Sequence, residues 1–506
     1  MFNILKKIIL ASFFTLVLSL LVIPGFRSHI FSLNFVDEDD NIVIGNYVKE
    51  GKVLYQDVFS QHQPSMFILS ADLQSIFKPD NILMVIKRHR EFVIVWSLMW
   101  LIILSARFGL FVLIPGILLE LSKITLLGNL FLAESLVIYP LIYLTLYLIV
   151  PKSSSRLWEY WVISLIFWFL WFSLAPLWPL LIICLCMIFY QSSHKPLLIQ
   201  TIITLGLLST LYLTQYISLK DYYYDVIFIN YKYYIPLTTP VGLPTSIIKA
   251  FFAPIYGLLS PKSGELLILI RMLSLGIILK TIYLIIDKKY FKAGIIFLVL
   301  GLSSLRYIEP SNTLYGAFHM LPWFALLISL NFVDLAHFSR MRMIQKIFQV
   351  VILVLVFASV INVAKVNLWD HRTPSTDFYV HYSPSEDIRT IVSILSQDVE
   401  QTIWVEPVMY WPYWNTKGNQ YSTMINYYDW MDQTPPMKNS LERQFASNLP
   451  TIVWAKTTLG IGNYLGSYSR FKRDGSYLDL YLRQDQIAKI SQKSRDALDY
   501  YRFEIN

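Results

Sequence analysis

The sequence predicts a polytopic α-helical membrane protein with about 11 transmembrane helices and a C-terminal soluble α/β domain. Hydrophobic residues make up 55% of the 506 residues and charged residues only 15%, and the mean hydropathy is +0.50. Apolar runs long enough to cross a bilayer recur until about residue 364, after which polar residues dominate. Soluble globular chains have neither this composition nor such runs.

The first apolar run, 8–23, follows Lys6 and Lys7, and no small-x-small cleavage site comes after it. We interpret it as an uncleaved first span with a cytoplasmic N-terminus rather than as a signal peptide. The odd total of about eleven spans places the C-terminus outside. The further spans are expected at roughly 91–106, 108–121, 134–150, 157–175, 177–191, 197–216, 264–286, 291–306, 318–334 and 346–363.

Basic residues support this orientation, because the positive-inside rule concentrates them in cytoplasmic connections. The rule also accounts for the net charge of +8, so we expect no nucleic-acid partner. Cys184 and Cys186 lie two positions apart in one apolar run, so a helix would point them to different faces. Packing roles, rather than a disulfide or a thiolate metal site, are expected for both. The basic sites on the predicted cytoplasmic side are Lys152, Arg156, His194, Lys195, Lys288, Lys289, Arg340, Arg342 and Lys346.

Two external segments are apolar but too short to span. The run 64–77 would reach about 21 Å as a helix and stops before Lys78 and Pro79. A Tyr-rich external loop, 217–245, leads into a second short apolar run, 247–259. Interfacial helices and simple packing at the membrane surface both remain open for the two apolar runs.

The predicted domains are 1–364, a transmembrane domain whose first external loop is 26–90, and 365–506, an external α/β domain. Strands are expected at 402–405, 451–455 and 477–482, and a helix at 386–395. Aromatic residues are frequent in this domain, at Trp404, 410–414 and 427–430. They could contact carbohydrate, but a buried aromatic core with a membrane-facing rim is the preferred interpretation.

Four consecutive acids, Asp37 to Asp40, follow the first span in a chain that is poor in charge. Asp39 or Asp40 could cap a helix that runs to Glu50 and ends with Gly51 in the left-handed conformation. Capping and solvation would explain one or two of the acids. Like charges beside lipid headgroups repel one another, so we expect a functional role for at least one.

The residues after the first span resemble the first external loop of the GT-C glycosyltransferases. The closest set is the bacterial branch related to protein O-mannosyltransferases and the lipid A aminoarabinose transferase, which carries Asp-Glu, then Gly-x-x-Pro-Tyr-x-Asp, then Lys-Pro-Pro. Leu54 here replaces a proline, and His62-Gln63-Pro64 replaces Lys-Pro-Pro, so whether His62 takes over from the lysine stays open. The matching residues are Asp37-Glu38, Gly51, Leu54-Tyr55-Gln56-Asp57 and Gln61-His62-Gln63-Pro64.

Further positions are similar to the family in the expected order. Arg90 opens the second span, and Glu134 opens the fourth span on the outer side, like the family's second acidic position. Arg306 and His319, the latter shortly before Pro322, resemble a basic residue and a His or Tyr ahead of a proline-bearing span. Anchoring at the membrane interface is the alternative for each. The resemblance covers roughly 1–335, and the C-terminal domain resembles no family that we can name.

The resemblance implies a glycosyltransferase that uses a polyprenyl-phosphate-linked sugar, with Asp37 as the general base. An acceptor hydroxyl is a poor nucleophile until a carboxylate takes its proton, and the leaving phosphate needs a cation. Transfer would proceed in line, with inversion at the anomeric carbon. The predicted catalytic residues are Asp37, Glu38 and Glu134, and the predicted substrate-binding residues are Asp57, His62, Arg90, Arg306 and His319.

No cofactor is expected, and we see no His/Cys/Asp metal cluster, although carboxylates alone could hold a divalent cation. The expected partners are the lipid-linked sugar, a glycan, lipid or protein acceptor of the cell envelope, and membrane lipids. The expected location is the cytoplasmic membrane, with catalysis on its outer face. The main alternative is a transporter or flippase of lipid-linked sugars, which predicts charged or broken segments near mid-membrane. A binding protein with an inactive loop is also possible.

Overall fold

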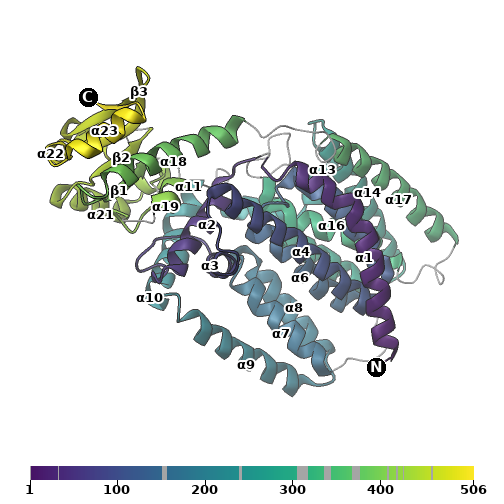
Figure 1. Cartoon of the computed structure of the whole chain (residues 1–506). Coiled ribbons are helices and arrows are strands. Elements are labelled where there is room, and N and C mark those ends of the chain that lie inside the picture. Colours follow the sequence, from purple (N-terminus) through teal and green to yellow (C-terminus); the bar gives the residue numbers. More distant parts are fainter. Residues whose placement is uncertain are drawn as a thin grey trace. The chain divides into compact units, whose positions relative to one another are not determined.

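The computed structural model describes residues 2–31, 33–150, 157–238, 242–304, 317–335, 343–366, 376–406, 410–416, 420–425, 427–456 and 460–506. Most of these residues are helical, and a small sheet lies near the C-terminus (Figure 1). The helices of the first 366 residues, some of them 3-10 or π, are α1 (Phe2–Ser28), α2 (Val36–Lys49), α3 (Ser65–Phe77), α4 (Ile82–Phe108), η1 (Leu110–Val112), α5 (Leu113–Ser122), η2 (Lys123–Leu126), α6 (Ala133–Ile149), α7 (Leu157–Trp171), η3 (Ala175–Leu177), α8 (Trp178–Gln191), α9 (Lys195–Leu213), α10 (Leu219–Tyr222), η4 (Tyr223–Tyr234), α11 (Ile235–Thr238), α12 (Leu243–Phe251), α13 (Ala253–Leu259), α14 (Glu265–Ile286), α15 (Tyr290–Leu302), η5 (Ala317–Met320), α16 (Leu321–Phe332) and α17 (Met343–Ala364).

The remaining elements belong to the C-terminal part of the chain. They are α18 (Thr376–Leu395), β1 (Ile403–Glu406), α19 (Trp411–Thr416), α20 (Asp429–Asp432), α21 (Pro435–Ser447), β2 (Ile452–Ala455), η8 (Gly462–Ser467), β3 (Tyr468–Arg473), β4 (Ser476–Arg483), α22 (Gln484–Ile487), α23 (Gln492–Tyr500) and β5 (Phe503–Ile505).

Six helices of the described residues are long and apolar enough to cross a membrane, as in an integral membrane protein. Their outward surfaces remain apolar; Leu16 and Leu20 on α1, for example, are 65% and 69% exposed. Four further predicted spans coincide with shorter apolar helices, so the total of eleven stays a prediction. The six are Lys7–Ser28, Ile82–Phe108, Lys195–Leu213, Glu265–Ile286, Phe318–Leu335 and Gln345–Ala364.

Most of the run predicted as one span at 108–121 lies in a helical stretch that is bounded by two left-handed residues. Gly109 has φ +110 and separates α4 from η1, while Leu127 has φ +59 directly after η2. Between these two left-handed residues the chain forms η1, the ten-residue α5 and η2 in succession. This helical stretch is not among the helices long and apolar enough to cross a membrane, so the span at 108–121 stays a prediction.

Contacts group the chain into two compact units. Unit 1 comprises Met1–Ile30, His89–Tyr212 and Val241–Thr373, and unit 2 comprises Phe31–Arg88, Leu213–Pro240 and Pro374–Asn506. In unit 1 the central helix is α16, whose twelve residues are all buried and which packs against α5, α6 and α14. The apolar core of unit 1 therefore surrounds α16. The boundary predicted after residue 364 stays a prediction.

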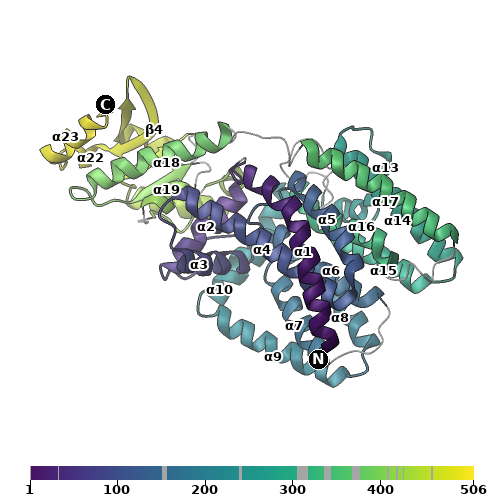
Figure 2. The ribbon, with the colours of Figure 1, turned by 45° about the vertical axis from the view of Figure 1, so that its right-hand side comes forward.

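Unit 2 contains a five-stranded mixed sheet of order β1-β2-β4-β3-β5. β1 and β2 are parallel, and the remaining neighbours are antiparallel. The helices α18, α22 and α23 lie beside the sheet in Figure 2. The three predicted strands are confirmed to within one residue at each end, and the predicted helix 386–395 is the second half of α18. β3 was not predicted because its sequence, YSRFKR, is largely polar, and β5 has only three residues.

α2 and α3, both from the predicted first external loop, pack against each other within unit 2. α2 crosses α3 closely: a Cβ added to Gly45 would lie 2.5 Å from the Ser70 side chain. Gln74 of α3 donates a hydrogen bond to the Ile42 carbonyl of α2 at 2.8 Å. The helix predicted at 64–77 is therefore confirmed. Its buried face, which includes Phe67 and Ser70, packs against protein.

Two expectations for unit 2 have clear outcomes. The predicted external loop 217–245 is wrong as a loop, because α10, η4 and α11 form a helical run over residues 219–238. The aromatic residues of the C-terminal part are mainly core, as preferred: Trp404, Trp411 and Tyr413 are each at most 1% exposed. Trp404 and Phe445 meet edge to face with their ring centroids 5.4 Å apart.

Candidate functional site

The four consecutive acids, Asp37 to Asp40, open α2 rather than precede it. The helix begins at Val36 after Phe35, which makes no side-chain capping bond. Asp39 and Asp40, expected as caps, therefore lie inside the helix, and that prediction is wrong. Carboxylates in a first turn favourably face the positive end of the helix dipole, which helps to offset their mutual repulsion. Gly51 has φ +91 beyond the C-terminal end of α2, as predicted.

Asp40 is a buried acid of α2 whose pKa is raised. It is 5% exposed, and its Oδ2 lies 3.9 Å from Nε2 of His62. The Tyr410 hydroxyl also hydrogen-bonds its carboxylate, and the Tyr428 hydroxyl lies 2.7 Å from that of Tyr410. Burial raises the pKa of Asp40 to about 7, against the opposing effects of His62 and Tyr410, and the Asp37 charge raises it further. A carboxyl that titrates near neutrality is typical of acid–base sites.

Asp37 and Glu38 differ in their access to solvent. Asp37 is half-buried, whereas Glu38 is fully buried. Asp37 lies three positions before Asp40, so the two carboxyls share one face of α2, and the Asp37 charge acts on both Asp40 and Tyr428. Of the two predicted catalytic acids on α2, Asp37 is therefore the one that a substrate in solution could reach.

The segment that follows α2 is fixed by its own hydrogen bonds. Asp57 Oδ2 accepts a hydrogen bond from the Val53 backbone N–H at 2.7 Å, and the Gln420 side chain donates to the Asp57 carbonyl. Tyr55 has φ +71, and its hydroxyl donates to the His62 carbonyl at 2.8 Å. The Asp57 carboxylate thus closes its own turn. The predicted substrate-binding role of Asp57 stays a prediction.

The helical run 219–238 holds the Gln61-His62-Gln63 motif from a second direction. Asn230 donates to the Gln61 carbonyl at 2.7 Å, and the Tyr222 hydroxyl donates to Gln63 Oε1 at 3.0 Å. His62 itself is half-exposed, with 37% of its side chain accessible. This run was missed as a contributor because its tyrosines suggested a loop. Asp225, on the same run, is 5% exposed.

In unit 1 the structure brings together two of the predicted residues. Nδ1 of His319 lies 2.9 Å from Oε1 of Glu134. The side chain of Glu134 is 7% exposed and that of His319 is 31% exposed. Phe318 packs beside the His319 ring, with 3.9 Å between the ring centroids. An imidazole beside a buried carboxylate is a suitable proton-transfer or anion-binding pair.

The two predicted substrate-binding arginines are Arg90 and Arg306, and the structure describes only Arg90. Arg90 is 2% exposed, and its Nη1 donates to the Ile30 carbonyl at 2.7 Å in unit 1. Arg306 lies outside the described residues. Asp37, Glu38, Asp57 and His62 belong to unit 2, whereas Arg90, Glu134 and His319 belong to unit 1. The predicted residues therefore fall into two separate groups, one around Asp40 and His62 in unit 2 and one at Glu134 and His319 in unit 1.

No group of three or more His, Cys, Asp or Glu side chains is arranged to hold a metal ion in the part of the chain that the structure describes. The acids of α2 face a histidine and tyrosines rather than one another alone. Asp40 in its protonated form would also be a poor ligand for a cation.

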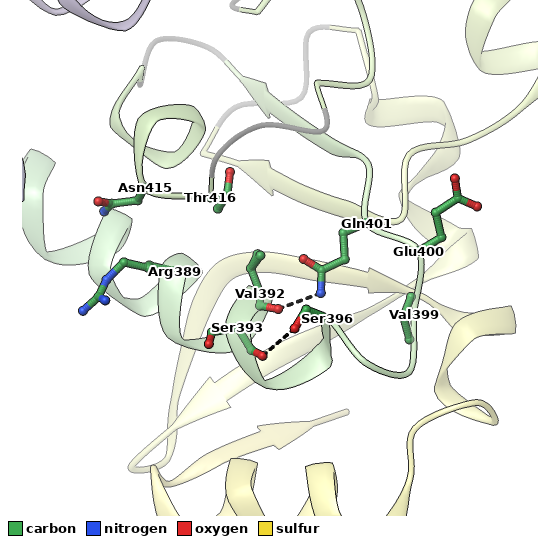
Figure 3. A pocket seen from close by; sticks show the side chains of 9 residues that line it. All are labelled: Arg389, Val392, Ser393, Ser396, Val399, Glu400, Gln401, Asn415 and Thr416. Carbon is green, nitrogen blue, oxygen red and sulfur yellow. Dashed lines mark hydrogen bonds between the residues drawn. The ribbon is translucent and has the colours of Figure 1, made fainter. Parts of the chain in front are cut away.

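Two cavities lie in the C-terminal part, and neither includes a predicted site residue. One, of about 490 Å³, is lined by residues such as Arg389, Glu400 and Asn415 (Figure 3). In it the Gln401 side chain donates to the Val392 carbonyl at 2.7 Å. The second, of about 760 Å³, includes Tyr464 and Arg443.

Comparison with known proteins leaves the family open. No protein family, no curated protein and no solved structure matches this chain. The resemblance of the first external segment to the GT-C glycosyltransferases therefore rests on its own residues.

Proposed function

We propose that this protein is a membrane glycosyltransferase that moves a sugar from a polyprenyl-phosphate donor to a cell-envelope acceptor on the outer face of the cytoplasmic membrane. The observation that carries the proposal is the approach of Asp40 to His62, 3.9 Å apart. This contact brings the run of acids at the start of α2 next to the Gln61-His62-Gln63 motif. The carboxyl that makes the contact, Asp40, has its pKa raised to about 7. Acid–base chemistry with a hydroxyl nucleophile suits such an arrangement.

Asp37 is the general base in this proposal. Its half-exposed carboxylate takes the proton of the acceptor hydroxyl while the hydroxyl oxygen attacks the anomeric carbon. The bond from that carbon to the phosphate oxygen breaks, and polyprenyl phosphate leaves with the electron pair. Asp40, buried one turn further along α2, holds its own proton near neutral pH. A half-exposed and a buried carboxyl on one helix face can thus take different roles.

Cationic groups stabilise the charge that builds on the leaving phosphate. His62 is the predicted cation in the same unit as Asp37, and its half-exposed ring can meet a substrate. Glu134 and His319 form a separate hydrogen-bonded pair in unit 1, to which we assign a role in orienting substrate.

Substitution of Asp37 tests the proposal directly. Wild-type protein and Asp37→Asn would be reconstituted in lipid nanodiscs, and transfer from a defined polyprenyl-phosphate sugar to envelope acceptors would be measured. Loss of the base predicts at least a ~100-fold fall in the transfer rate. Asp80→Asn is the matched control, because Asp80 is exposed in the same external segment. Undiminished transfer by a folded Asp37→Asn variant would overturn the assignment of the base.

A flippase for lipid-linked sugars remains the second candidate, and one observation favours it. Nζ of Lys123 lies 2.8 Å from Oε1 of Glu120, and both residues are at most 2% exposed. Glu120 lies in α5 and Lys123 begins the adjoining η2. Buried charges within membrane segments are typical of transporters. Movement of a fluorescent lipid-linked sugar across proteoliposomes, without transfer to any acceptor, would favour this candidate.

A further inference from the structure

Gln63 is an incompletely satisfied side chain in the core of unit 2. It is 5% exposed, its Oε1 accepts from the Tyr222 hydroxyl, and its Nε2 has no hydrogen-bond partner. A hydroxyl can donate or accept, so turning the carboxamide round would satisfy the nitrogen and leave the oxygen unpaired. In either orientation one buried polar atom remains open. Native proteins rarely leave such an atom without water or a ligand.

Asp225 is a second buried side chain of unit 2 without a hydrogen-bond partner among the described residues. It is 5% exposed on η4, and its carboxyl accepts no hydrogen bond from the described residues. Burial raises its pKa to about 8, and the charge of Asp221, four residues earlier, raises it further. Asp221 itself accepts a hydrogen bond from the Ser218 hydroxyl at 2.6 Å. Of these two acids on one helical run, Asp225 is thus the buried and unpaired one.

Tyr222 and Tyr55 connect the two groups. Tyr222 binds Gln63 and precedes Asp225 by three residues, and its ring lies 5.4 Å from that of Tyr55. The charge of Asp225 acts on the Tyr55 hydroxyl. Both neighbouring backbones are unusual, since η4 is a π-helix of twelve residues and Tyr55 has φ +71. Such irregular backbone is often retained at binding sites.

These groups suit a ligand rich in hydroxyls. A hydroxyl can accept from the Gln63 amide and donate to the Asp225 carboxyl, and tyrosine rings pack against the apolar faces of sugars. The nearby Asp221 disfavours an anion, so the phosphate of a lipid-linked donor would lie elsewhere. We propose that Gln63 and Asp225 bind hydroxyl groups of a sugar beside Tyr55 and Tyr222. Only the assignment of that sugar to a transfer reaction rests on the proposed function.

A binding role has a different signature in stability from a packing role. Replacing a polar group that has no partner removes its desolvation cost, so the empty protein keeps or gains stability while it loses the ligand. Replacing a group that has a hydrogen-bond partner in the protein instead lowers the stability of the empty protein and leaves ligand binding unchanged. Gln63→Leu and Asp225→Ala are the informative variants, and Asp225→Asn is a second, isosteric change in case the alanine variant does not fold. Asp221→Asn is the matched control on the same helical run.

The experiment uses the full chain in lipid nanodiscs and follows the thermal unfolding midpoint against a panel of neutral monosaccharides and a polyprenyl-phosphate hexose. At least one sugar is expected to raise the wild-type midpoint, and its apparent affinity to fall about tenfold in Gln63→Leu and Asp225→Ala. Asp221→Asn keeps the wild-type response. General osmotic stabilisation by sugar is the same in every variant. The part of the midpoint rise that Gln63→Leu and Asp225→Ala lose therefore measures specific binding.

Two results would overturn the inference. One is a wild-type midpoint that moves with no sugar beyond the osmotic effect. The other is a pair of variants that lose stability when empty yet keep the wild-type sugar response. Wild-type protein that responds to sugar but transfers none would reject the proposed function and leave the sugar site standing.

Discussion

Nδ1 of His319 lies 2.9 Å from Oε1 of Glu134, although 185 positions separate the two residues. Glu134 is in the first turn of α6, and His319 is in η5, directly before α16. Packing of α6 against α16 in unit 1 brings the two together. The Glu134 carboxylate is nearly buried, and the His319 imidazole contacts it directly.

We predict that Glu134 and His319 act as one unit in catalysis. Glu134→Gln and His319→Asn should each lower the rate of sugar transfer by about tenfold or more, because each removes the charge-assisted bond. The double variant should be no slower than the slower single variant. The three variants and His194→Gln, an exposed control, would be compared in one transfer assay. A double variant whose loss equals the product of the single losses would show that the residues act independently.

We predict that Asp40 makes the protein less stable as the pH rises. Burial raises its pKa from 3.8 to about 7, so the folded state keeps a proton that the unfolded chain has released. Its contribution to stability is fully present below about pH 4 and is lost as the pH rises through about 7. Asp40→Asn should therefore flatten the fall of the unfolding midpoint between pH 5 and 8. The full effect corresponds to on the order of 4 kcal/mol.

Thermal unfolding of wild type, Asp40→Asn and Asp80→Asn across that pH range measures the effect. Asp80 is exposed, so its variant should keep the wild-type slope. Burial also raises the pKa of Asp225 to about 8. Asp225 therefore makes the unfolding midpoint fall with rising pH as well, and this fall persists in Asp40→Asn. The comparison therefore uses the difference between wild type and variant at each pH. Equal slopes for wild type and Asp40→Asn would contradict a buried, protonated Asp40.

Apolar periodicity predicted the helical class and the positions of the long helices, because a span is a local property of the sequence. Short β-like runs also predicted three strands of the C-terminal sheet, in which apolar residues such as Val453 and Leu480 are buried. Gly51 was predicted from its residue type alone, since left-handed backbone favours glycine. These features depend on neighbours in the chain and on simple chemistry.

Features that depend on distant contacts were not predictable. Asp40 was set aside as a cap, and only its burial by distant parts of the chain raises its pKa to about 7. Asp225 was overlooked because the Tyr-rich sequence around it was interpreted as a loop, whereas the chain forms a π-helix there. The spacing of residues along α2 could have suggested Asp40, because it shares a helical face with Asp37.

The buried ion pair of Glu120 and Lys123 allows a prediction that separates the two candidate functions. Glu120 also accepts a hydrogen bond from the Tyr139 hydroxyl at 2.6 Å, and Lys123 donates to the Ser97 hydroxyl at 2.8 Å. A Cβ on Gly128 would lie 2.8 Å from the Lys123 side chain, so the connection to α6 packs directly on the pair. The pair thus has all the partners and close packing of a structural element.

Removing one partner leaves the other charged and buried, so Glu120→Gln and Lys123→Met should each destabilise the protein by about 3–5 kcal/mol. The double variant Glu120→Gln with Lys123→Met should recover most of that stability, because no charge remains unpaired. A glycosyltransferase would keep its transfer rate in the double variant, since the pair then serves only the fold. A transporter that uses the pair would stay folded and lose movement of the lipid-linked sugar. Unfolding midpoints, transfer and lipid movement measured on the same preparations decide between these outcomes.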